Sequence, residues 1–169
     1  TELSSELKYR DRCISLHFIT NAPDSPIVEV VRGVDTSDEV YNDVCKFIKL
    51  LGKQVVAVTE SPGLISVRMF APIINEACDV LMEGVGTLKD IDLTMKTGLG
   101  LTLGPFELSD KVGLDQVLRW MDNLYQEFGN IKYKASPLIK RKVRANHLGR
   151  KTGKGFYEYD QEGNIISAK

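Results

Sequence analysis

A histidine and a glutamate twelve positions apart are the residues whose types and spacing could do chemistry. His17 lies in the alternating segment CISLHF at 13–18, and Glu29 is the one carboxylate in the apolar run IVEVVR at 27–32. In a hairpin centred on Pro23 the two residues would face each other across two strands, because they are equally distant from it. A histidine held by a carboxylate suits general-base catalysis at neutral pH. The spacing alone leaves two interpretations open, a catalytic dyad and a buried structural pair.

Two glycine-rich segments have a superficial likeness to phosphate-binding loops. GRKTGKG at 149–155 has one residue too few between its first glycines for the pattern G-x-x-x-x-G-K-[ST], and it follows a predicted helix rather than a strand. TGLGLTLG at 97–104 lacks the G-x-G-x-x-G spacing, which favours a tight connection between helices. Neither segment predicts a nucleotide site.

The cysteines and histidines do not predict a metal site. Cys13, Cys45 and Cys78 are more than thirty positions apart without a C-x-x-C pair, and His17 and His147 are the only histidines. Three reduced cysteines are typical of a cytoplasmic protein, so a cytoplasmic location is expected.

The elements that must position the dyad come first in the chain. The two segments that carry His17 and Glu29 are predicted strands because their apolar residues alternate or run together. A helix is predicted over 36–51, with Thr36 and Glu39 as a capping box. A third strand, QVVAV, is predicted over 54–58. So small a sheet leaves edges uncovered, so we expect a further segment in front of it or another chain to cover them.

After about residue 60 the apolar residues follow a helical period. A long helix is predicted from about 62 to 83, with Ser61 as N-cap and Pro62 in its first turn. Further helices are predicted over 87–95, 105–112, 114–128 and 136–147, and the tail is typical of a short hairpin. The chain therefore divides into a small α/β part and a helical part.

Composition excludes several partner classes. The 169 residues include 22 Lys and Arg against 23 Asp and Glu, for a formal charge of -1. Without a basic excess, neither nucleic acid nor a membrane surface is an expected partner. No apolar run approaches the roughly 18 residues of a membrane span.

Several motifs, in order and spacing, resemble NAD-dependent L-3-hydroxyacyl-CoA dehydrogenases, especially the bacterial 3-hydroxybutyryl-CoA type. They are LHF with a glutamate twelve positions after its histidine, SPGLISVR, MKTGLG followed by GPFELSDKVGLD, and LGRKTGKGFYEY. The resemblance extends over nearly the whole chain, to about Tyr159.

The resemblance implies a mainly α chain with two domains. Residues 1–60 would be a small α/β remnant of a Rossmann-like NAD-binding domain, and residues 61–169 a multi-helical substrate and dimerisation domain. The NAD-binding segment would then be absent from this chain, so no residue here is expected to bind NAD and the chain alone is expected to be inactive. A homodimer through the helices after residue 62 is expected.

The resemblance also implies roles for single residues. His17 would take the proton from the 3-hydroxyl of an acyl-CoA substrate as hydride leaves C3 for NAD, and Glu29 would orient His17. The substrate-binding asparagine of the family falls on Val67, which cannot donate a hydrogen bond. Ser66 is only a weak substitute, because it points about 100° away around the helix.

Two alternatives belong to other functional classes. The chain could be a non-catalytic helical module that dimerises or holds an acyl-CoA, which Val67 favours and the retained dyad opposes. It could also be a related hydroxy-acid dehydrogenase that acts on sugar acids, although such enzymes share the His-Glu pair and lack the LGRKTGKGFYEY ending.

Overall fold

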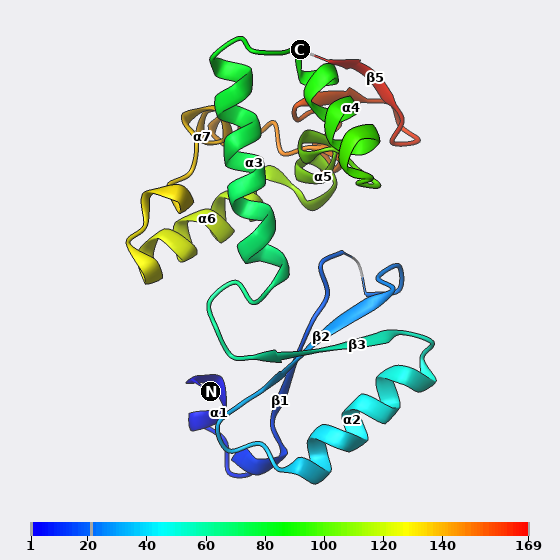
Figure 1. Ribbon diagram of the computed structural model, residues 1–169, viewed down its shortest axis with the longest axis vertical. Coiled ribbons are helices and arrows are strands. Elements are labelled where there is room, and N and C mark those ends of the chain that lie inside the picture. The colour runs from blue at the N-terminus through cyan, green and yellow to red at the C-terminus, as the bar shows by residue number, and fades with distance from the viewer. Residues whose placement is uncertain (1, 21, 169) are drawn as a thin grey trace. The chain divides into compact units, whose positions relative to one another are not determined.

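The computed structural model describes residues 2–20 and 22–168 and divides the chain into two compact units, Thr1–Val67 and Arg68–Lys169 (Figure 1). The first unit contains α1 (Glu2–Ser5), η1 (Arg10–Arg12), β1 (Ile14–His17), β2 (Ile27–Arg32), α2 (Asp38–Leu50) and β3 (Gln54–Thr59). The following helices are α3 (Ser66–Met82), α4 (Leu88–Leu99), α5 (Pro105–Val112), α6 (Leu114–Phe128), η2 (Ile131–Tyr133), α7 (Pro137–Arg144) and η3 (Arg150–Thr152). The last elements are β4 (Tyr157–Tyr159) and β5 (Ile165–Ala168).

The first unit is a three-stranded sheet with α2 on one face (Figure 1). β2 is the central strand, antiparallel to β1 and parallel to β3, and α2 is the crossover helix between β2 and β3. Val28 and Val30 of β2 pack against Ile48 of α2 in the core. Because side chains alternate along a strand, Glu29 of β2 points to the opposite face of the sheet.

The start of α2 differs by one residue from the prediction. Ser37, not Thr36, is the N-cap, and its hydroxyl accepts the Val40 N–H. The Thr36 hydroxyl instead donates to the Cys13 carbonyl at 2.6 Å and accepts the Gly33 N–H. Thr36 thus ties the loop before α2 to the loop before β1, a long-range contact that local spacing could not indicate.

α3 begins four residues later than predicted. The segment after Ser61 forms a turn in which Gly63 and Leu64 have positive φ angles of 74° and 49°, and α3 starts only at Ser66. A left-handed residue cannot continue a right-handed helix, so the Ser-Pro signal marks this turn rather than the first turn of the helix. The delay leaves the N–H groups of residues 65 and 66 without partners inside the helix.

The second unit is a set of helices closed by the β4–β5 hairpin, which lies beside α5 (Figure 1). The core is formed by buried side chains from α5, α6, α7 and the start of the hairpin segment, among them Phe106, Leu114, Met121, Ile139 and Phe156. The predicted helix over 114–128, the Thr87 and Ser136 caps and the hairpin are confirmed.

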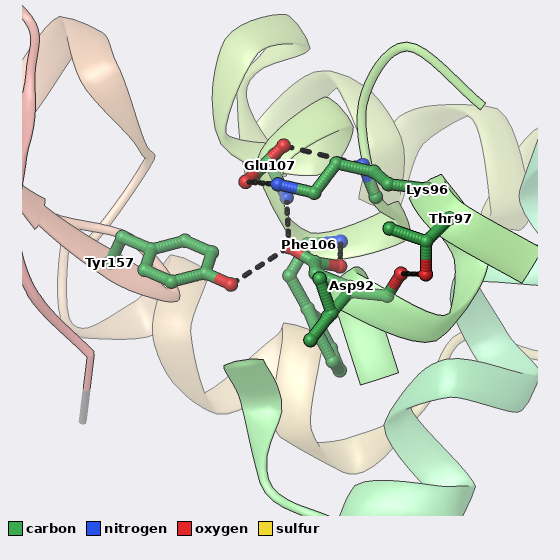
Figure 2. A network of polar contacts seen from close by, with 8 residues as sticks. Asp92, Lys96, Thr97, Phe106, Glu107 and Tyr157 are labelled. Atoms are coloured by element: carbon green, nitrogen blue, oxygen red, sulfur yellow. Dashed lines mark hydrogen bonds and ion pairs between the residues drawn. The ribbon is translucent and has the colours of Figure 1, made fainter. Parts of the chain in front are cut away.

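Two buried aspartates connect the elements of the second unit. Asp92 of α4 accepts the N–H groups of Phe106 and Glu107 at the start of α5 and the Tyr157 hydroxyl of β4 (Figure 2). A Cβ atom on Gly104 would overlap the Asp92 side chain, so the helix connection passes here only as glycine. The predicted connection at 97–104 is thus confirmed only from Gly100 onward, because α4 continues through residues 97–99 to Leu99.

Asp110 of α5 makes the second connection. Its carboxylate accepts the N–H groups of Phe156 and Tyr157, both at 2.9 Å, and the hydroxyl of Tyr159 at 3.0 Å. The added Cβ of an alanine at Gly155 would overlap Asp110 Oδ1. The glycine- and aromatic-rich motif at the end of the chain is thus used to close the fold.

The prediction of a mainly α chain with a small α/β remnant was wrong. Three strands of four to six residues and α2 form an α/β unit of their own, and a second sheet lies in the helical unit. The prediction counted residues, and short strands contain few of them. The three strands nevertheless form a complete layer of the first unit.

Candidate active site

The dyad predicted from spacing is present in the first unit. His17 of β1 and Glu29 of β2 are register partners, which confirms the predicted hairpin pairing. His17 Nδ1 lies 2.7 Å from Glu29 Oε2. The Glu29 side chain is 2% exposed and the His17 side chain 29% exposed, so the carboxylate is enclosed while the ring remains partly accessible.

Three further hydrogen bonds hold the Glu29 carboxylate. The backbone N–H groups of Ile65 and Ser66 donate to Oε1 at 3.1 and 2.9 Å, and the Ser66 hydroxyl donates to Oε2 at 2.8 Å. These are the N–H groups that the late start of α3 leaves free. The turn at 62–65 therefore supplies the donors that compensate the burial of this charge.

The hydrogen bonds decide the charge of Glu29. Burial acts to raise the pKa of Glu29, but the side-chain and backbone hydrogen bonds from Ser66, together with the bond and charge of His17, outweigh it and hold the pKa below its usual value. Glu29 is therefore an anion at neutral pH and can only accept hydrogen bonds. The hydrogen in the His17–Glu29 contact consequently belongs to Nδ1, which leaves the lone pair of a neutral ring on Nε2.

Val67 and Ser66, the residues at the predicted substrate-binding positions, lie in the first turn of α3. Val67 is 5% exposed, and Ser66 is 6% exposed with its hydroxyl on Glu29. Sequence reasoning missed this contact because a helix from residue 62 would place Ser66 inside its second turn. The signal was the glycine at position 63, which permits the turn that exposes the N–H groups.

The three cysteines are free thiols. Within the described ranges 2–20 and 22–168, no group of three or more His, Cys, Asp and Glu side chains could hold a metal ion. None of the helices in these ranges has both the length and the apolar character to cross a membrane.

In the first unit, the N-terminus of α2, the helix that follows β2, is a possible position for the phosphates of a dinucleotide. The first turn of α2 carries Asp38 and Glu39, whose charges disfavour a pyrophosphate at that helix N-terminus. This helix start does not fit the phosphates of NAD. Among the described residues of the first unit, the predicted site residues that hydrogen bonds link are His17, Glu29 and Ser66.

Two family models match the chain. Residues 1–61 match the 3-hydroxyacyl-CoA dehydrogenase NAD binding domain, and residues 63–159 match the 3-hydroxyacyl-CoA dehydrogenase C-terminal domain. The prediction that the NAD-binding segment is absent conflicts with the first match and was wrong as stated. A glycine-rich phosphate turn marks only one loop of an NAD-binding domain, and the segment from β2 to β3 carries no comparable motif.

Curated relatives and solved structures agree with these matches. A 3-hydroxybutyryl-CoA dehydrogenase of Clostridioides difficile is 44% identical over 95% of this chain and 57% of its own length. The mitochondrial hydroxyacyl-coenzyme A dehydrogenase of Homo sapiens is 36% identical over 94% of this chain and 51% of its own length. The crystal structure of (S)-3-hydroxybutyryl-CoA dehydrogenase PaaH1 from Ralstonia eutropha has a TM-score of 0.88 and 41% identity, over 95% of this chain and 57% of that one.

The chain spans about half the length of the curated relatives that it matches. Within that span, the strand pair that carries the dyad falls inside the first matched region, and the elements from α3 to β4 fall inside the second. The chain belongs to the 3-hydroxyacyl-CoA dehydrogenase family.

Proposed function

We propose that this chain is part of an NAD-dependent dehydrogenase that converts a 3-hydroxyacyl-CoA to the 3-oxoacyl-CoA, with 3-hydroxybutyryl-CoA as the substrate. The observation that carries the proposal is the 2.7 Å contact between a part-exposed His17 and a buried Glu29. The names of the relatives, 3-hydroxybutyryl-CoA and hydroxyacyl-coenzyme A dehydrogenases, support the substrate class.

His17 and Glu29 have distinct tasks in this reaction. Oxidation removes a hydride from C3, which NAD accepts when bound, and a proton from the 3-hydroxyl. His17 Nε2 is the base that accepts this proton, because its Nδ1 already carries the hydrogen donated to Glu29. The ring becomes an imidazolium, and the negative charge of Glu29 stabilises it without itself taking the proton.

The reverse reaction provides the test. NADH consumption is followed with acetoacetyl-CoA for the longest gene product that contains residues 1–169, and for these residues alone. We expect turnover on the order of 10 s⁻¹ from the former and none from the latter. Binding of acetoacetyl-CoA without turnover would favour the acyl-CoA-binding module, and turnover of a sugar acid instead would favour the related hydroxy-acid dehydrogenase.

We also propose a homodimer in which residues 61–169 form the substrate and dimerisation domain. Apolar side chains lie exposed on α3 and α4, among them Met69, Met82 and Leu93. A groove of about 440 Å³ between these helices has mostly apolar walls that include Val80 and Ile91. A second copy of the chain would remove this surface from water.

Light scattering at micromolar concentration tests the dimer. We expect a mass of about twice 18.9 kDa for the chain. Val80→Glu is expected to give a monomer, because it places a charge within the apolar groove. A monomeric wild-type chain would contradict the proposal.

A cytoplasmic location is also proposed, because the three cysteines are free thiols.

A further inference from the structure

We propose that Ser66 is a positioning residue, which holds the Glu29 carboxylate in the orientation that receives the Nδ1 hydrogen of His17. The catalytic meaning of this role rests on the proposed dehydrogenase function. The contact itself, and its effect on the state of the His17 ring, do not depend on any substrate.

Ser66 touches both oxygens of the carboxylate. Its backbone N–H donates to Oε1 at 2.9 Å and its hydroxyl donates to Oε2 at 2.8 Å. Ile65 adds one bond, also to Oε1. A residue bonded to both oxygens opposes rotation of the carboxylate about its last side-chain bond. Oε2, the oxygen that accepts from His17, is thereby kept directed at Nδ1.

Solvent has little opportunity to take the place of the Ser66 hydroxyl. Ser66 and Glu29 are both buried, at 6% and 2% exposure. The next residue in the helix, Val67, has no side-chain donor, and the Ile65 side chain is equally apolar. A hydroxyl at position 66 is therefore the side-chain group from α3 that donates to Oε2.

The Ser66 bonds also determine where a proton rests during the reaction. When His17 Nε2 accepts a proton, the ring carries hydrogens on both nitrogens and a positive charge. Transfer of the Nδ1 hydrogen to Oε2 would then neutralise both partners and remove the charge pair. Hydrogen bonds to the carboxylate favour its charged form, so the hydrogen stays on Nδ1 and the ring keeps a fixed direction.

NMR of the isotopically labelled chain tests the wild-type arrangement. The chain has only two histidines, so a His17→Gln variant assigns the imidazole signals and His147 is an internal reference. At a pH where the ring is neutral, we expect His17 to be protonated at Nδ1 and unprotonated at Nε2. The carboxyl carbon of Glu29 should titrate below the usual range of glutamate, and a normal or raised pKa of Glu29 would overturn the proposal.

Ser66 variants test the cause. In Ser66→Ala we expect Glu29 to bind its proton about tenfold more tightly and a second His17 species, protonated at Nε2, to gain population. Ser66→Thr keeps the hydroxyl and should restore both signals. Ser15→Ala, an exposed serine of β1, should change neither. If Ser66→Ala retains the wild-type signals of both residues, the proposal is wrong. If this variant does not fold, Ser66→Cys, a weaker donor, must move the same signals in the same direction.

Kinetics of the full gene product that contains residues 1–169 separate this proposal from the proposed function. A positioning residue acts on the chemical step, so Ser66→Ala should lower kcat about tenfold with KM nearly unchanged. NMR signals as expected without any dehydrogenase activity would leave the positioning role standing and refute the function. Dehydrogenase activity that is lost in His17→Gln but unchanged in Ser66→Ala would support the proposed function and refute the positioning role of Ser66.

Discussion

Replacing His17 with glutamine is expected to lower kcat for acetoacetyl-CoA reduction by a factor of about 10² to 10⁴. Glutamine can fill most of the space and can still donate a hydrogen bond to Glu29, but it has no nitrogen that exchanges a proton near neutral pH. KM is expected to change little, because the variant retains the surroundings of the ring. Initial rates measured at several acetoacetyl-CoA concentrations, with NADH in excess, give kcat and KM separately.

The matched control is His147→Gln, which changes the other histidine of the chain. His147 follows α7 in the second unit, away in sequence from the strands that carry the dyad. We expect kcat to remain within about twofold of wild type for this variant, since it touches no proposed catalytic group. Equal rates for wild type and His17→Gln would remove His17 from the mechanism, whatever the control shows.

Glu29→Gln should impair the proposed base, because it removes the negative charge that holds the hydrogen of His17 on Nδ1. The carboxamide of glutamine has one acceptor oxygen and one donor nitrogen, whereas the carboxylate of Glu29 accepts all four of its hydrogen bonds. With its oxygen in the place of Oε1, the glutamine can keep the other two contacts only if the Ser66 hydroxyl accepts and His17 Nδ1 accepts as well, which moves the hydrogen of the neutral ring to Nε2. The lowered pKa of Glu29 means that its contribution to stability is present above the usual glutamate pKa and is lost as the pH falls through the lowered value. The acid limb of the stability curve should flatten in this variant.

The sequence allowed the dyad to be predicted because it depends on strand periodicity and on one hairpin register. Period-two alternation placed His17 and Glu29 on one face, and the distance of each from Pro23 set the pairing. Ser66 was harder to place, because its role depends on two residues with positive φ in the preceding turn. The Ser-Pro pair at 61–62 also satisfies the rules for the start of a helix, so the sequence does not reveal these backbone angles.

Long-range polar contacts were beyond sequence reasoning for a different reason. Thr36 has the type and spacing of a cap, yet its hydroxyl bonds to Cys13 across the unit. Asp92 and Asp110 lie within amphipathic helices and carry no local mark of burial, although each accepts three hydrogen bonds from residues more than ten positions away. Partners so distant in sequence are determined by packing and not by periodicity.

The second large effect is expected on stability, from Asp110→Ala. Asp110 is 1% exposed, and its removal leaves the N–H groups of Phe156 and Tyr157 and the Tyr159 hydroxyl without their acceptor in a buried site. Each unsatisfied buried donor is costly, so we expect a loss of about 3 to 5 kcal/mol in the free energy of unfolding. Urea denaturation followed by the fluorescence of Trp120, the single tryptophan and a residue of α6, reports on this unit.

Two pairs of variants separate the buried network from general effects of the substitutions. Asp160 also accepts several hydrogen bonds, from Glu162 and Asn164, but it is exposed, so water replaces it and Asp160→Ala should shift the denaturation midpoint only slightly. Gly155→Ala should destabilise strongly, because the new methyl group meets the Asp110 carboxylate. Gly98→Ala, in α4 with open space around it, should instead stabilise the helix by up to about 1 kcal/mol. Opposite signs for the two glycine-to-alanine changes would locate the effect at the Asp110 carboxylate. A small loss of stability in Asp110→Ala would contradict the prediction. It would mean that water, or the Lys142 ammonium that donates to the Gly155 carbonyl, can support the hairpin without the carboxylate.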